Sequence, residues 1–144
     1  GGDDAQLTWS PTSEAIKSLP FSLVGISEAE QTKATDRDPQ TVLFTTSKEL
    51  IIDLGKNTEV SQLLYLPDQS DAHRGLIHSY TISACDAKGN VIKTLKSDEF
   101  SNIQNNPILQ TVTFPATTTR FLKLSADRMV KDGEQIGIAE LGVK

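Results

Sequence analysis

The chain has 144 residues, of which 37% are hydrophobic and 23% charged, and its net charge is −5. This length suits one domain that can bury a core without the help of a disulfide or a metal. The acidic balance excludes a nucleic-acid partner, which needs a basic face, and no apolar run approaches the ~18 residues that insertion into a membrane requires.

Residues 1–19 are polar and are predicted to be a lead-in or linker, followed by one domain over residues 20–144. Trp9 in the linker covers the edge of the domain or offers a platform for a ligand. The chain opens on Gly1 without a methionine, so we expect it to be a piece of a longer protein.

From Phe21 onward the sequence alternates apolar and polar residues with a period of two, in short runs that end at turn residues. About eight strands and no amphipathic helix are predicted, the strands at residues 21–27, 49–54, 59–66, 76–85, 91–95, 110–114, 120–125 and 136–143. Turns are expected at residues 55–57 and 86–90. Cys85, the single cysteine, is expected to be buried. This pattern is typical of an antiparallel β-sandwich or barrel, so the predicted fold class is all-β.

Asp36, Asp38 and Thr41 lie within six residues and can gather carboxylate, hydroxyl and carbonyl oxygens around one point. Hard cations such as calcium prefer such oxygen ligands. The alternative is that the two aspartates only cap a turn by accepting backbone hydrogen bonds. The sequence therefore leaves both a calcium site and a capped turn open.

Catalytic equipment is missing from the sequence. The two histidines are separate from a nucleophile, and the motifs of a nucleophile elbow, a P-loop, a dinucleotide fold and a zinc protease are absent. Counting carboxylates does not exclude a glycosidase, but the best acidic cluster is turn-like and suits calcium. We expect this domain not to be an enzyme.

Four segments, taken in order, resemble the discoidin-like family, which includes the coagulation factor V/VIII type C domains and the family-32 carbohydrate-binding modules. The segments are Ala-Thr-Asp-Arg-Asp-Pro-Gln-Thr at 34–41, Ile-Asp-Leu-Gly at 52–55, Tyr-Leu-Pro at 65–67 with Arg-Gly-Leu-Ile at 74–77, and the closing pair at 120–124 and 138–141. The resemblance implies an eight-stranded jelly roll that is galactose-binding-domain-like and covers about residues 21–144.

In this family the acidic loop meets a glutamate near the C-terminus, here Glu140. The resemblance thus implies a structural calcium ion held by side chains and carbonyls of Ala34, Asp36, Asp38, Thr41, Ala139 and Glu140. Arg37 stands where the family often has glycine, and Glu140 could instead pair with Arg37 or Lys33.

Family modules carry a histidine after a core tryptophan and an arginine after the Leu-Pro pair. Here those positions are Phe44 and Asp68, and Leu43 replaces the tryptophan. Residues left in the same loops that could contact a sugar are Phe44, Asp68, Gln69, Asp71, His73, Arg74, Asn105 and Asn106. Phe44 could stack on a sugar or fill the space of the tryptophan, and His73 and Arg74 could bind hydroxyls or form an ordinary ion pair with Asp68 or Asp71.

The loop at 98–107 is similar to loops of modules attached to bacterial α-L-fucosidases and related exo-glycosidases. The resemblance implies a non-catalytic module that targets such an enzyme to fucosylated or galactose- or hexosamine-containing glycans, in the periplasm or outside the cell. Its partners would be the glycan and the catalytic domain of the same polypeptide. The alternatives are a structural module that packs on the catalytic domain without binding sugar, and a module for protein or lipid recognition, of which the acidic balance disfavours the lipid version.

Overall fold

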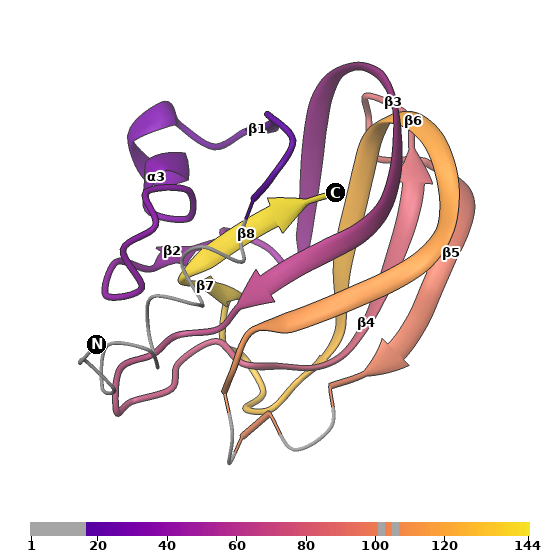
Figure 1. Cartoon of the computed structure of the whole chain (residues 1–144). Helices are drawn as coiled ribbons and strands as arrows, with labels where there is room; N and C mark the ends of the chain where they lie inside the picture. Colours follow the sequence, from indigo (N-terminus) through magenta and orange to yellow (C-terminus); the bar gives the residue numbers. More distant parts are fainter. Residues whose placement is uncertain (1–16, 101–102, 105–106) are drawn as a thin grey trace, which may run out of the picture.

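The computed structural model describes residues 17–100, 103–104 and 107–144, in which eight strands and one short helix alternate with loops (Figure 1). In chain order these elements are β1 (Ser22–Leu23), α3 (Glu28–Thr32), β2 (Leu43–Phe44), β3 (Glu49–Leu66), β4 (Ile77–Cys85), β5 (Val91–Glu99), β6 (Gln110–Met129), β7 (Gly137–Ile138) and β8 (Glu140–Val143).

The strands pair antiparallel in a six-stranded sheet and a two-stranded sheet. The larger sheet has the order β1-β3-β6-β4-β5, with β8 also paired to β3, and the smaller one joins β2 to β7. The long strands β3 and β6 curve together and serve both layers of the sandwich (Figure 1). At the level of Leu50, β6 also pairs with β4, and at the level of Leu63, β3 also pairs with β8. The predicted all-β sandwich is confirmed.

Two pairs of predicted strands are each one continuous strand. Residues 49–54 and 59–66 both belong to β3, and residues 110–114 and 120–125 both belong to β6. The turn predicted at residues 55–57 is wrong: the pairing of β3 with β6 only shifts register between Asp53 and Thr58. The Asp53 carboxylate accepts a hydrogen bond from the N–H of Gly55 at 2.8 Å, so the extra residues form a pinned bulge while the strand continues.

The first predicted strand is also mostly wrong. Only Ser22 and Leu23 pair with β3, although strand pairing was expected through Ser27. Ser27 instead caps α3, because its hydroxyl accepts a hydrogen bond from the N–H of Glu30 at 3.2 Å. Glu28 and Glu30 in the first turn further favour a helix there through their interaction with the helix dipole.

The chain just before β1 is hydrogen-bonded to the last strand. The N–H of Leu19 donates to the Val143 carbonyl at 2.8 Å, and the N–H of Val143 donates to the Ser18 hydroxyl at 2.9 Å. Ser18 and Leu19 fall in the segment predicted as a linker. Trp9, in the same segment, lies outside the described residues. No described helix has the length and apolar character needed to cross a membrane.

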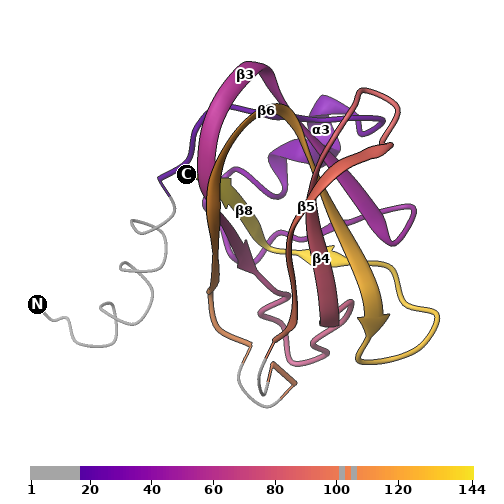
Figure 2. The ribbon, with the colours of Figure 1, turned by 90° about the vertical axis from the view of Figure 1, so that its right-hand side faces the viewer.

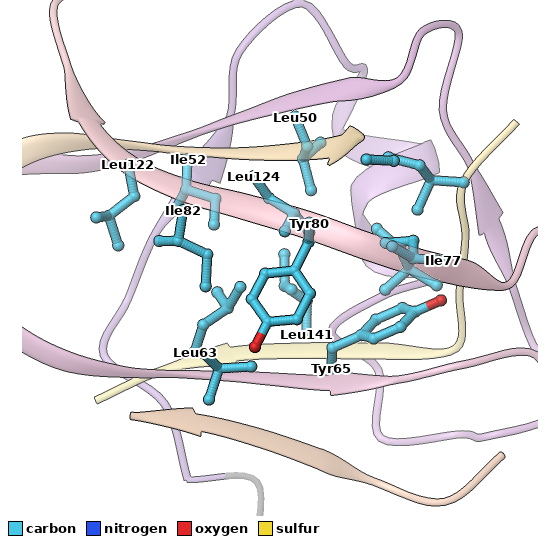
Figure 3. Close-up of a cluster of buried hydrophobic side chains, with 14 of the residues drawn as sticks. Leu50, Ile52, Leu63, Tyr65, Ile77, Tyr80, Ile82, Leu122, Leu124 and Leu141 are labelled. Carbon is cyan, nitrogen blue, oxygen red and sulfur yellow. The ribbon is translucent and has the colours of Figure 1, made fainter. Parts of the chain in front are cut away.

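The core lies between the inner faces of the two layers, and its side chains alternate along each strand as the period of two predicts. Figure 3 shows its centre, where Tyr65 and Tyr80 lie among Leu, Ile and other apolar side chains from β3, β4, β6 and β8. Cys85 is buried as expected. Tyr65 is fully buried, and its hydroxyl donates to the Gly137 carbonyl at 3.0 Å.

We expect Tyr65→Phe to lower the free energy of unfolding by about 1 to 3 kcal/mol, because the Gly137 carbonyl loses its buried partner. Urea titration measures this loss. Tyr80→Phe is the matched control, since the Tyr80 ring stacks on Phe100 and, within the part of the chain that the structure describes, its hydroxyl makes no hydrogen bond. Equal losses in the two variants would contradict a role for the Tyr65 hydrogen bond.

Candidate functional site

The acidic loop between α3 and β2 folds back through its own carboxylates. Asp36 accepts a hydrogen bond from the N–H of Asp38, and Asp38 accepts one from the N–H of Gln40, both at 2.9 Å. The capped turn, one of the two predicted interpretations, is therefore present. Arg37 lies inside it with φ +63°, so this turn forms without a glycine at a cost of roughly 1 to 2 kcal/mol.

Several oxygen atoms of the same loop converge on the Thr41 hydroxyl. Thr41 Oγ1 lies 2.6 Å from Asp36 Oδ2, 3.0 Å from the Asp38 carbonyl oxygen and 3.3 Å from the Lys33 carbonyl oxygen. Carboxylate, hydroxyl and carbonyl oxygens are the ligands that calcium prefers. The chemistry of the group thus fits calcium as well as it fits a turn.

Glu140, the first residue of β8, closes this loop and is 2% exposed. Its carboxylate accepts a hydrogen bond from the N–H of Arg37 at 3.0 Å. Burial, and then the neighbouring Asp36 carboxyl, raise the pKa of Glu140 to about 8. A cation between two such acidic groups would stabilise their charged forms. A hollow of about 190 Å³ reaches Glu140 and is lined by Ser18, Leu19, Pro20, Phe21, Gln31, Thr35, Arg37, Glu140 and Leu141.

The resemblance implied backbone ligands from Ala34 and Ala139, and both stay predictions. The Ala34 carbonyl accepts a hydrogen bond from the N–H of Leu141 at 2.9 Å, so it joins the loop to β8. Ala139 is buried, and its N–H donates to the Leu66 carbonyl at 2.8 Å. The carbonyls beside Thr41 belong to Lys33 and Asp38, which sequence reasoning did not name because a carbonyl carries no signal in the side-chain pattern.

The described ranges, with their gaps at 101–102 and 105–106, contain no group of three or more His, Cys, Asp or Glu side chains arranged to hold a metal. A cation in the acidic loop would therefore depend on the carboxylates of Asp36 and Glu140 and on neutral oxygens. Lys33 forms its ion pair with Glu30 at 2.9 Å, rather than with Glu140.

The loop between β3 and β4 is organised by Asp68, whose side chain is fully buried. Its carboxylate accepts hydrogen bonds from the Ser70 N–H at 3.0 Å, the Ser70 hydroxyl at 2.8 Å and the Arg74 N–H at 2.9 Å. Burial alone would raise the pKa of Asp68, but these donors together lower it below its ordinary value. An enclosed carboxylate of this kind shapes the loop, which contradicts the prediction that Asp68 contacts a sugar.

Gln69 also holds loops together. Its side-chain amide donates to the Pro67 carbonyl at 2.8 Å and to the Pro107 carbonyl at 2.7 Å, which joins the loop after β3 to the one before β6. Its side-chain amide is thus engaged by these two loops, and its contact with a sugar stays a prediction. The predicted sugar ligands Asn105 and Asn106 lie outside the described residues.

Phe44 and Arg74 pack against each other at this end of the sandwich. The Arg74 guanidinium carbon lies 4.7 Å from the centre of the Phe44 ring, and Arg74 Nε lies 3.7 Å from Asp68. A Cβ placed on Gly137 would lie only 2.9 Å from Phe44 Cε1, so the ring also packs closely on β7. Leu43, at the position of the family's tryptophan, is buried. Phe44 thus packs on β7 and also lines a hollow described below, and Arg74 covers its ring by a cation–π contact.

Gly75, next to Arg74, and Gly137 on β7 bring two backbone segments into contact. The N–H of Gly137 donates to the Gly75 carbonyl at 3.0 Å. A Cβ on Gly75 would lie 2.3 Å from the Gly137 nitrogen and 2.5 Å from the Gln135 carbonyl oxygen, and φ of Gly75 is +72°. Only glycine is compatible with this close approach and this dihedral angle. Residues 74–75 are thus held directly on β7.

The first surface hollow at this end, which we call the Phe44 hollow, has a volume of about 480 Å³ and is lined by Phe44, Arg74, Gly75, Gly133, Glu134 and Gln135. Its lining comes mainly from the loops at residues 67–76 and 130–136. The ribbon of both loops can be followed in Figures 1 and 2, and in Figure 1 they lie at the lower end of the molecule. Glu134 is fixed in it because Oε1 accepts a hydrogen bond from the N–H of Gly75 at 3.1 Å.

Sequence reasoning missed Glu134 and Gln135. The available signal was the polar stretch just before the last strand. The pairing of β2 with β7, which brings this stretch to Phe44, depends on contacts between residues about 95 positions apart.

A second hollow adjoins the first, because Glu134 lines both. This His73 hollow has a volume of about 210 Å³ and is lined by Ala72, His73, Leu76, Gln104, Val130, Lys131 and Glu134. His73 takes a φ of +43°, which is uncommon for a residue with a side chain. The structure therefore places the predicted residues His73 and Arg74 in two neighbouring hollows.

The sequence model of the F5/8 type C domain family matches residues 26–141 of the chain. This match confirms the resemblance inferred from the four segments, and it includes the acidic loop and both hollows. No curated protein sequence matches the chain significantly.

Among solved structures, a family 32 carbohydrate-binding module of NanJ from Clostridium perfringens, in complex with galactose, has 23% identity and a TM-score of 0.65. That likeness covers 92% of this chain and 95% of the other. CpGH89CBM32-5 from the same organism, in complex with GalNAc-β-1,3-galactose, has 18% identity and a TM-score of 0.63, with 92% and 96% covered. These likenesses show a shared fold.

A glycoside hydrolase 29 family member from an unknown rumen bacterium has 28% identity and a TM-score of 0.62. The likeness covers 77% of this chain but only 19% of the hydrolase. The chain thus corresponds to about a fifth of that longer protein.

Proposed function

Because this chain belongs to the F5/8 type C domain family, we propose that it is a non-catalytic carbohydrate-binding module that holds a glycan in the Phe44 hollow. The observation that carries the proposal is the meeting of an arginine, a carboxylate, an amide and an aromatic ring in one hollow of about 480 Å³. Sugar recognition uses such planar polar groups for paired hydroxyls and an apolar surface for C–H groups.

Two of these groups are held in place for hydrogen bonding. Glu134 keeps one carboxylate oxygen on the Gly75 N–H, which leaves its other oxygen to accept from a sugar hydroxyl. Arg74 is attached to Asp68 through its backbone and its Nε, while its side chain is 56% exposed. Such preorganised donors and acceptors bind at a lower entropic cost than mobile ones.

The ligand class we propose is a galactose- or hexosamine-containing or fucosylated glycan, and the parent protein an exo-glycosidase that resembles α-L-fucosidases. Support comes from the sugars in complex with the two Clostridium modules and from the hydrolase whose segment matches this chain. A weak module of this kind raises the local concentration of glycan at an attached active site. Such a protein would act in the periplasm or outside the cell.

A second candidate is a structural module that packs on the catalytic domain and binds no sugar. One observation favours it: Arg74 covers the Phe44 ring, which was the best surface for stacking on a sugar. The histidine and arginine expected at positions 44 and 68 are also replaced. The titration described below separates the two candidates.

We further propose that the acidic loop holds a structural calcium ion. Asp36, Thr41 and Glu140 would supply side-chain oxygens, and Lys33 and Asp38 would add carbonyls. The ion would supply positive charge between Asp36 and Glu140. Because Glu140 belongs to the last strand, the ion would join the two ends of the domain.

Titration calorimetry with fucose, galactose and N-acetylhexosamines at millimolar concentration tests the sugar proposal. We expect Arg74→Ala and Glu134→Gln each to weaken binding about tenfold or more, since each removes a hydrogen bond from a charged group. Arg120→Ala is the matched control: its guanidinium lies 4.9 Å from the Phe121 ring and pairs with Asp53, in the same kind of arrangement. No binding of any sugar by the unmodified domain would favour the structural candidate.

A further inference from the structure

We propose that the His73 hollow is a subsite for a second sugar ring, so that one glycan lies across Glu134 with a ring in each hollow. This inference rests on the proposed function of the Phe44 hollow. The two hollows share the lining residue Glu134, and most of their other lining comes from the same two loops, at residues 67–76 and 130–136, with Phe44 added in the first hollow and Gln104 in the second. A ligand in one is therefore adjacent to the other without any movement of the fold.

Glu134 is placed to serve both rings. Its Oε1 is held by the Gly75 N–H at 3.1 Å, and Glu134 lines both hollows. A carboxylate has about four acceptor positions, so one bond to the backbone leaves others for hydroxyls on either side. A ligand that spans the two hollows would use this fixed group twice.

The lining of the His73 hollow suits a neutral sugar ring. Leu76 and Val130 offer apolar surface for C–H groups, and Gln104 and Lys131 offer donors for hydroxyls. The charge of Lys131 is balanced by that of Glu134, so the hollow lacks the excess positive charge that selects phosphate or sulfate. Its volume of about 210 Å³ is less than half that of the Phe44 hollow, which suits a single further ring.

His73 is held in this hollow against a backbone preference. Its φ is +43°, and its N–H donates to the Ser70 carbonyl at 3.1 Å in a tight turn. Glycine would adopt this dihedral angle without steric cost. Strained residues of this kind gather at binding sites, where the side chain has a use. We assign that use to contact with the second ring.

The test compares monosaccharides with disaccharides on the whole domain. Dissociation constants are measured by calorimetry for galactose and N-acetylgalactosamine, and for GalNAc-β-1,3-galactose and N-acetyllactosamine. We expect the domain to bind a disaccharide about tenfold more tightly than the corresponding monosaccharide, the gain of one to two hydrogen bonds.

His73→Gly and Lys131→Ala should remove that tenfold gain and leave monosaccharide binding unchanged. His73→Gly is the safer variant, because glycine suits the positive φ, and an unchanged melting temperature shows that it folds. Arg74→Ala should weaken both kinds of ligand. Equal affinity for both kinds in the unmodified domain, or a gain that survives both substitutions, would overturn the second subsite while the Phe44 hollow stands. Absence of binding to all four sugars and to fucose would overturn both proposals.

Discussion

Without calcium, the free energy of unfolding of this domain is expected to fall by about 3 kcal/mol as the pH rises from 5 to 8. The pKa of Glu140 is raised from 4.5 to about 8 in the folded chain, so the folded state keeps a proton that the unfolded state releases. Between pH 4.5 and pH 8 the free energy of unfolding therefore decreases as the pH rises. Each unit of difference between the folded and unfolded pKa corresponds to about 1.36 kcal/mol, which sets the size of the expected loss in stability. Urea titration across this pH range measures it.

Glu140→Gln should abolish this dependence on pH, because the amide carries no charge and its oxygen can still accept from the Arg37 N–H. At pH 8 the metal-free variant is then expected to be more stable than the metal-free original. Glu59→Gln, at an exposed position on β3, is the matched control and should keep the slope. An equal slope in all three proteins would contradict the role assigned to Glu140.

Calcium should reverse the effect at pH 8, since a cation favours the ionised forms of Asp36 and Glu140. An ion that binds only the folded state at 100 times its Kd adds about 2.7 kcal/mol. For a domain of this size that gain raises the melting temperature by roughly 5 to 10 °C. Glu140→Gln should lose most of this rise. A melting temperature of the original domain that does not respond to calcium or chelator would refute the calcium proposal.

Gly75→Ala is expected to lower the free energy of unfolding by about 4 kcal/mol. The added Cβ would lie 2.3 Å from the Gly137 nitrogen and 2.5 Å from the Gln135 carbonyl oxygen, and both are backbone atoms that cannot rotate away. The positive φ adds a further cost. Losses of this size are exceptional for single substitutions and arise from such named clashes. Thermal unfolding should show a decrease in melting temperature of roughly 8 to 16 °C.

Gly133→Ala is the control for the dihedral angle alone. Gly133 has φ +86° in the neighbouring loop, but a Cβ there meets nothing within 4 Å. This variant should therefore lose only about 1 kcal/mol. If both alanine variants lost the same amount, the backbone contact between Gly75 and Gly137 would not be the cause. In Gly75→Ala we also expect weaker sugar binding, because Arg74 and Glu134 are both positioned through residue 75.

The acidic loop could be predicted well from sequence, because its chemistry is local. Asp36, Asp38 and Thr41 are neighbours in the chain, and their side chains can only meet within that short loop. The distant partner Glu140 came from the family resemblance, and the structure places it there through the pairing of β8. The carbonyls of Lys33 and Asp38 remained hidden because every residue has a carbonyl.

The loop after β3 shows why polarity alone predicts a binding residue poorly. Asp68 was expected to contact a ligand, since aspartate in a polar loop is usually exposed. The loop instead closes around its carboxylate with three hydrogen bonds. Glu134, which the sequence pattern did not distinguish from other acidic residues, is the acidic residue that lines both hollows.

By itself the sequence determined the all-β class and most strand positions, because alternating burial and turn residues act over a few neighbouring positions, and its four segments carried the resemblance to the family. Only the tertiary structure decided that β3 and β6 are continuous bent strands, that Arg74 covers Phe44, and that Glu134 stands between two hollows. The physical reason is that these features depend on pairings such as Leu43 with Ile138 and on the backbone contact of Gly75 with Gly137. Contacts between residues so far apart in the chain leave no periodic pattern in the sequence, and they form only when the sheets come together.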